Sequence, residues 1–171
     1  GLREQMKYRQ LGNTDLIISE IGFGAWGIGG SNNDDIAYGK TDDQVSIETL
    51  RYALDRGVTF YDTSDFYGGG KSETLIGQAF KSNRRDVILA TKGGMVNAKG
   101  VRFIDRKYIE ESLYSSLQRL RTDYIDLYQL LSPTLKSLYQ NPETFEFLES
   151  AKKQGLIREY GISLESPTQG F

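Results

Sequence analysis

The chain has 171 residues, the usual size of one domain, and its 38% hydrophobic and 26% charged residues are typical of a globular protein. Its 21 basic and 23 acidic side chains give a net charge of −2, which argues against an electrostatic nucleic-acid surface. No apolar run approaches the roughly 18–20 residues of a membrane span. The sequence has no cysteine and no histidine, which excludes disulfides, thiolate nucleophiles, imidazole metal sites and Ser-His-Asp triads.

The N-terminal region predicts a β-hairpin over residues 7–19. Two short runs, Lys7–Leu11 and Leu16–Ser19, flank the polar turn Gly12–Asp15. The first five residues lack the apolar core of a secretory signal, which predicts a cytoplasmic protein.

Beyond the hairpin, short β-type runs alternate with amphipathic helices. The predicted strands are Ile17–Gly24, Val58–Asp62, Asp86–Thr91, Tyr124–Leu130 and Ile157–Ser163. The helix signals are, in chain order, a capping box at Thr41–Gln44, an apolar stripe within Leu75–Phe80, a cap at Asp105, and a cap with a first-turn proline at Asn141–Pro142. Gly57 and Gly155 stand where the first and fourth helices should end.

Serial βα units of this kind imply a parallel sheet with right-handed crossovers. Two architectures fit the pattern, a doubly wound open sheet and a (β/α)8 barrel. A barrel needs eight units and typically about 250 residues, whereas five strands are predicted here. If the fold is a barrel, the chain holds an incomplete one.

The carboxyl ends of parallel strands are where function gathers in α/β proteins. The residues there are Gly24, Ala25, Trp26, Asp62, Lys92, Leu131 and Ser163, with Tyr67 five residues beyond Asp62. Without histidine or cysteine, proton chemistry falls to Asp, Glu, Lys or Tyr. A phenol donates a proton at neutral pH only when a nearby cation stabilises its anion, and Lys92 held by Asp62 would do that for Tyr67. The residues alone leave open the alternative of a buried ion pair beside a surface tyrosine.

Several ordered motifs resemble the aldo-keto reductase family. They are Tyr8–Gly12, Ile21–Trp26, Phe60–Gly68, Ser72–Gly77, Ala90–Gly94 and Arg121–Leu130, and the similarity runs from about Lys7 to Phe171. The resemblance implies a (β/α)8 TIM-type barrel, present here as a single partial domain over residues 1–171, with the hairpin at 7–19 and βα units over 20–171. It implies reduction of an aldehyde or ketone by hydride from NADPH, with NADH as the alternative, and without a metal.

Carried over by position, the resemblance gives the strand-end residues specific roles. Tyr67 would be the general acid, Lys92 would lower its pKa, and Asp62 would anchor Lys92. Gly24, Ala25 and Trp26 would line the mouth of the cofactor and substrate site, and Ser163 would bind the nicotinamide carboxamide.

The sequence departs from the family pattern at two points. The family's catalytic histidine is replaced by Leu131, and the last strands and loops of the barrel are absent. Two functions therefore remain open: an aldo-keto reductase-like oxidoreductase, and a catalytically impaired or non-catalytic barrel fragment that acts as an interaction or regulatory module. Exposed sheet edges predict self-association or a partner that covers them.

A glycine pattern, Gly22–Gly27, also has the spacing of a dinucleotide-binding fingerprint. That fingerprint requires its third glycine to open a helix. Here a loop follows, and helix signals wait until Thr41, so a Rossmann domain is not predicted.

Overall fold

A computed structural model describes residues 6–24, 40–65, 67–94, 104–131 and 135–163. Its strands are β1 (Tyr8–Gln10), β2 (Ile17–Ser19), β3 (Gly22–Gly24), β4 (Phe60–Asp62), β5 (Ile88–Gly93), β6 (Ile125–Leu131) and β7 (Ile157–Ser163). Its helices are α2 (Lys40–Asp55), α3 (Lys71–Phe80), α4 (Arg106–Arg119), α5 (Leu135–Gln140) and α6 (Pro142–Lys153), with 3-10 turns η3 (Tyr67–Gly70) and η4 (Arg84–Asp86).

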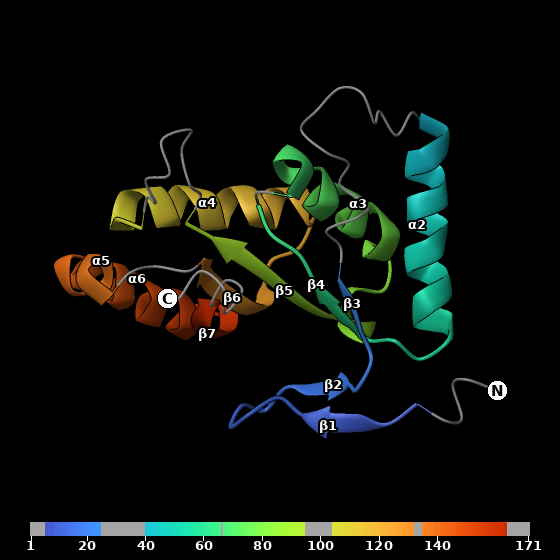
Figure 1. Cartoon of the computed structure of the whole chain (residues 1–171), viewed down its shortest axis with the longest axis horizontal. Helices are drawn as coiled ribbons and strands as arrows, with labels where there is room; N and C mark the ends of the chain where they lie inside the picture. Colours follow the sequence, from blue (N-terminus) through green and yellow to red (C-terminus); the bar gives the residue numbers. More distant parts are fainter. Residues whose placement is uncertain (1–5, 25–39, 66, 95–103, 132–134, 164–171) are drawn as a thin grey trace, which may run out of the picture.

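The main sheet has five strands in the order β3-β4-β5-β6-β7, and all neighbouring pairs are parallel. Strand order therefore follows chain order, as expected of successive βα units in a barrel wall. Helices α2, α3, α4 and α6 contact one another in turn along the sheet, while the hairpin lies apart from them (Figure 1). The predicted incomplete barrel matches this arrangement.

The core lies between the helices and the sheet. The apolar stripe of α3 is buried as predicted, with Leu75 at 2% and Ile76 at 0% exposure. On the strands, Tyr61 and Tyr128 are the largest fully buried side chains. Gly77 of α3 permits the close approach of α4, because a Cβ atom there would lie 2.3 Å from the Arg119 carbonyl oxygen.

The predicted hairpin forms from β1 and β2, which pair antiparallel. It is fastened to the segment that enters β4, because Ser19 and Thr59 exchange two hydrogen bonds, of 2.9 and 3.1 Å. The Tyr8 hydroxyl also donates to the Gly57 carbonyl oxygen at 2.9 Å. The hairpin therefore lies at the amino ends of the parallel strands, opposite the end where site residues are predicted.

Two predicted boundaries are wrong for local reasons. The run Ile17–Gly24 is not one strand: β2 and β3 are separated where the Ser19 hydroxyl donates to the Ile21 carbonyl at 2.6 Å and the chain turns from the hairpin to the main sheet. The predicted cap at Thr41 is wrong because α2 begins at Lys40, so Thr41 is already helical, whereas a capping residue has a non-helical backbone.

The region before α6 also differs from the prediction. The short helix α5 was not predicted, and it ends directly before Asn141. The Asn141 amide reaches back to donate to the Ser137 carbonyl at 2.8 Å, so its side chain does not cap α6. The cap predicted at Asp105 is confirmed, since its carboxylate accepts from the Tyr108 backbone N–H at 3.3 Å.

Candidate active site

Strand register places the predicted residues of the described strands on one face of the sheet. Gly24 pairs with Asp62, Asp62 pairs with Ala90, and Lys92 lies two residues further along β5. Lys92 pairs with Gln129, and Leu131 pairs with Ser163. Paired residues and residues two apart share a face, so Gly24, Asp62, Lys92, Leu131 and Ser163 all face the side away from the covering helices.

Lys92 and Asp62 form an ion pair at the carboxyl end of β4. Their charged atoms, Nζ and Oδ1, are 2.6 Å apart, and Nζ also donates to the Thr63 carbonyl oxygen at 3.0 Å. The Lys92 side chain is only 8% exposed, whereas Asp62 is 41% exposed. The pair thus holds a desolvated ammonium group in a fixed position next to solvent.

Leu131 and Ser163 end the next two strands. They pair with each other one side-chain level beyond Lys92, which is about 6–7 Å along the strands. The Leu131 side chain is aliphatic and half-buried, so it brings neither a donor nor an acceptor to this edge. Ser163 brings a hydroxyl group to the same edge.

The remaining predicted site residues are Ala25, Trp26 and Tyr67. Ala25 and Trp26 lie outside the described residues. For Tyr67 the structure describes the backbone, which opens the turn η3 five residues after Asp62. That turn leads directly into α3.

The segment between Asp62 and this turn is attached to β5 by its backbone. Thr63 N–H donates to the Ala90 carbonyl at 2.9 Å, and Asp65 N–H donates to the Lys92 carbonyl at 3.2 Å. The Thr63 hydroxyl also bonds the Ser72 hydroxyl of α3 at 2.7 Å. These bonds extend the β4–β5 ladder past the end of β4.

Sequence reasoning missed a buried polar cluster behind this segment. Glu73 of α3 is 0% exposed, and its two oxygens accept from the Thr91 hydroxyl at 2.7 Å and from Arg119 at 2.7–2.8 Å. Asp65 lies nearby and accepts from the Ser112 hydroxyl at 2.7 Å. A glutamate beside the apolar stripe of the second helix is the signal that would have pointed to a buried partner.

Asp65 is the carboxylate of this cluster with the perturbed acidity. Burial raises the pKa of Asp65 to about 6, with the negative charge of Glu73 adding to the rise. The Ser112 hydrogen bond and the Arg119 charge act in the opposite direction on this pKa, but less strongly than burial does. Arg119 is already bound to Glu73, so one cation serves two carboxylates.

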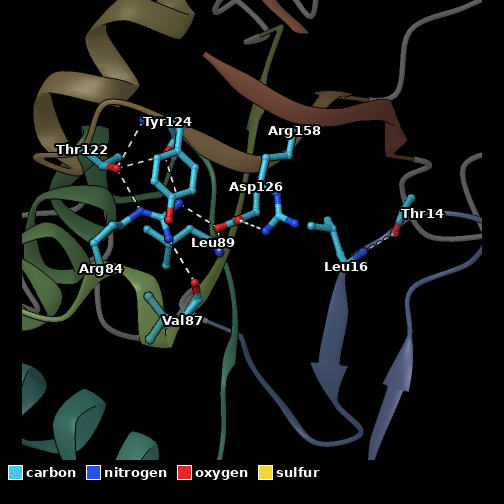
Figure 2. Close-up of polar contacts among 9 residues, drawn as sticks. All are labelled: Thr14, Leu16, Arg84, Val87, Leu89, Thr122, Tyr124, Asp126 and Arg158. Carbon is cyan, nitrogen blue, oxygen red and sulfur yellow. Dashed lines mark hydrogen bonds and ion pairs between the residues drawn. The ribbon is translucent and has the colours of Figure 1, made fainter. Parts of the chain in front are cut away.

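A separate ion cluster lies at the amino ends of the strands (Figure 2). Asp126 of β6 is 1% exposed and accepts from Arg84 at 2.7 Å, from Arg158 at 3.0 Å and from the Leu89 N–H at 2.8 Å. The Arg84 guanidinium lies 4.0 Å from the centre of the Tyr124 ring. This cluster joins η4, β5, β6 and β7 at the end opposite to Lys92.

The sheet face that carries Lys92 has open space over two of its glycines, as far as the described residues show. A Cβ atom built at Gly24 or at Gly161 would meet nothing within 4 Å, and Gly161 pairs with Gln129 at the level of Lys92. Among the described residues, His, Cys, Asp and Glu form no group of three that could hold a metal ion. No helix in those same ranges is both long and apolar enough to cross a bilayer.

Residues 20–169 match the model of the Aldo/keto reductase family. The chain belongs to this family. The aldo-keto reductase YhdN of Bacillus subtilis (strain 168) is 42% identical over 162 residues, which cover 92% of this chain and 47% of that protein. The chain thus spans about half the length of the curated relatives it matches.

Solved aldo-keto reductases have the same fold as this chain. The holo form of the reductase AKR11C1 from Bacillus halodurans is 38% identical with a TM-score of 0.79, and the match covers 96% of this chain and 52% of that one. A Klebsiella pneumoniae aldo-keto reductase in complex with NADPH is 28% identical with a TM-score of 0.71, covering 89% and 48% respectively. The aldo-keto reductases are (β/α)8 barrels, and the five parallel strands here form part of such a barrel.

Proposed function

We propose that the protein reduces an aldehyde or ketone to an alcohol with a reduced nicotinamide cofactor. The observation that carries the proposal is the buried Lys92 ammonium, held 2.6 Å from Asp62 at the carboxyl end of the sheet. Buried lysines are costly unless paired, and such a pair at the mouth of a barrel is a candidate for proton chemistry rather than for packing.

In the proposed reaction Tyr67 donates its phenolic proton to the carbonyl oxygen. The Lys92 ammonium stabilises the phenolate that remains, and Asp62 together with the Thr63 carbonyl fixes the position of that ammonium. When bound, the nicotinamide supplies the hydride that the carbonyl carbon accepts. One C–H and one O–H bond form, and solvent returns the proton to Tyr67.

The residues present fit a nicotinamide ring at this edge. A Cβ atom would meet nothing within 4 Å at Gly24, which pairs with Asp62, or at Gly161, which lies at the level of Lys92 on β7. Ser163 offers a hydroxyl group that would bind the carboxamide. Ala25 and Trp26 would complete the mouth. NADPH is the cofactor we propose, supported by its presence in the Klebsiella pneumoniae relative, and NADH is the alternative to be compared with it.

Leu131 favours a second candidate function. An aliphatic side chain at this strand end cannot orient a carbonyl oxygen, and losing one such polar group costs about 10²–10³ in rate. The alternative is therefore a catalytically impaired or non-catalytic barrel module that binds a partner. The outer strands of the described sheet, β3 and β7, are the edges that self-association or such a partner would cover, and light scattering would measure the assembly.

Titration of the purified protein with NADPH and with NADH, followed by the fluorescence of its single tryptophan, Trp26, tests cofactor binding. Turnover of small aldehydes is then compared between the wild type and Leu131→His. We expect saturable binding and a gain of about 10²-fold in kcat for the variant.

Tyr67→Phe in the Leu131→His background is the matched control, because it keeps the ring and removes the proton. It should abolish the gain while leaving cofactor affinity unchanged. Absence of cofactor binding by the folded protein would reject the reductase and leave the partner-binding module as the function.

A further inference from the structure

A chain of hydroxyl groups connects the sheet to the segment that follows β4. The Tyr128 hydroxyl of β6 donates to Ser112 Oγ on α4 at 3.3 Å, and Ser112 in turn donates to Asp65 Oδ2 at 2.7 Å. Tyr128 is fully buried. The hydroxyl groups thus connect β6, through α4, to a carboxylate two residues before Tyr67.

The sequence provides the space that this chain of hydroxyl groups occupies. A Cβ atom at Gly93 would lie 2.1 Å from the Tyr128 phenolic oxygen and 3.0 Å from Ser112 Oγ. Gly93 directly follows Lys92 in β5. Any side chain at Gly93 would thus displace the hydroxyl groups, in the strand that also carries the ammonium group.

Asp65 is attached on two sides. Its backbone N–H bonds the Lys92 carbonyl of β5 at 3.2 Å, and its carboxylate bonds Ser112 of α4. The next described element is η3, which begins at Tyr67 and leads into α3. The two attachments hold the Asp65 backbone against β5 at Lys92 and its carboxylate against α4.

We propose that Asp65 is a positioning residue: held by Ser112, it fixes the backbone of residues 63–65 and 67–70 relative to Lys92. This proposal rests on the proposed function in one respect: it takes Tyr67 as the proton donor, and Asp65 positions the backbone of that residue. Asp65 acts through that backbone and does not itself touch the substrate.

Burial makes the contribution of Asp65 dependent on pH, and the charged groups around it modify this dependence. Glu73 faces Asp65 from α3, Arg119 and Tyr108 face it from α4, and Tyr128 faces it from β6. A hollow of about 320 Å³ that is lined by Asp65, Ser112 and Glu111, among others, lets solvent reach the carboxylate. Because burial raises the pKa of Asp65 to about 6, acidification below that value weakens the charge-assisted bond from Ser112.

The test uses backbone amide chemical shifts of residues 63–65 and 67–70 in the wild type, Ser112→Ala and Asp65→Asn. In the wild type these shifts should titrate with a midpoint near pH 6. Ser112→Ala should displace them at neutral pH. Asp65→Asn keeps an acceptor for Ser112 but carries no charge, so its shifts should match those of the acidified wild type and should not titrate.

Ser115→Ala is the matched control, because Ser115 lines the same hollow on the same helix but is not part of the hydroxyl chain. Unchanged shifts in Ser112→Ala, equal to those of Ser115→Ala, would overturn the proposal. Activity gives a second measurement: kcat of Ser112→Ala should fall about ten- to hundredfold, with KM for the cofactor unchanged. If the wild type shows no turnover while the amide shifts behave as expected, the positioning role stands and the reductase proposal fails.

Discussion

The two ends of the parallel sheet each contain a carboxylate paired with a cation, and the two pairs are built differently. At the amino ends, Asp126 is 1% exposed and receives hydrogen bonds from two arginines and a backbone N–H. At the carboxyl ends, Asp62 is 41% exposed and holds a single, buried lysine. The first carboxylate is enclosed by its partners, whereas the second keeps contact with solvent.

This difference separates stability from reactivity. Each partner of Asp126 fastens a different part of the wall, since Arg84 belongs to η4, Leu89 to β5 and Arg158 to β7. The contacts of Lys92 join β5 to the last residue of β4 and to Thr63, which follows it. We infer that the amino end supports the barrel wall, while the carboxyl end holds charge where a ligand would reach it.

Replacement of Asp126 by asparagine should give the largest loss of stability. It would leave the Arg84 guanidinium, which is 13% exposed, without its carboxylate. Removing one partner of a buried pair costs about 3–5 kcal/mol. Urea unfolding measures the change, with Glu159→Gln in the more exposed Lys152–Glu159 pair as the control, for which about 0–1 kcal/mol is expected. Equal losses in the two variants would remove the distinction between the ends.

Replacement of Lys92 by methionine should have a small effect on stability and a large effect on activity. Methionine fills much of the same volume, and the remaining Asp62 is solvated, so stability should change by about 1 kcal/mol or less. Carbonyl reduction should fall about 10²–10³-fold, because the Tyr67 phenolate would lose its cation. Steady-state kinetics measured in the Leu131→His background checks this expectation. A large loss of stability with unchanged turnover would make Lys92 a structural residue.

The sequence predicted the strand-end residues more accurately than the contacts behind them. A parallel βα pattern by itself predicted that Asp62 and Lys92 lie at the carboxyl ends of their strands, and the structure confirms it for neighbouring strands β4 and β5. The pattern also predicted the apolar stripe of α3, because helical periodicity depends only on local spacing. These features needed no knowledge of distant contacts.

The missed features all depend on residues that are distant in the sequence. Asp65 and Ser112 are 47 positions apart, and Glu73 and Arg119 are 46 apart. Gly93 is required by a hydroxyl group that reaches it from β6, which no local pattern indicates. Local spacing cannot show such partners, whereas tertiary packing decides them. Asp126 stands within a motif that resembles the family, yet only its burial shows that it is structural.

Substitution of Asp65 should give the smallest change in stability, and it tests the comparison most specifically. The negative charge of Asp65 is incompletely neutralised, whereas that of Asp126 is enclosed by its cationic partners. Its pKa rises from 3.8 to about 6 on folding, so between these values the folded protein binds more protons than the unfolded chain. Its contribution to stability is therefore fully present below about pH 4 and is lost as the pH rises through 6. Relative to the wild type, Asp65→Asn should gain about 1–2 kcal/mol between about pH 4 and pH 7.

Urea unfolding of both proteins across this range measures the difference, and Asp123→Asn, at an exposed position, is the control that should show no such gain. A variant that follows the wild type at every pH would mean that Asp65 is as well neutralised as Asp126. A gain that develops as the pH rises from about 4 to 7, together with loss of the amide titration, would show that the carboxyl end retains a charge that destabilises the fold. Such a charge is expected where a site is held ready for a ligand rather than optimised for packing.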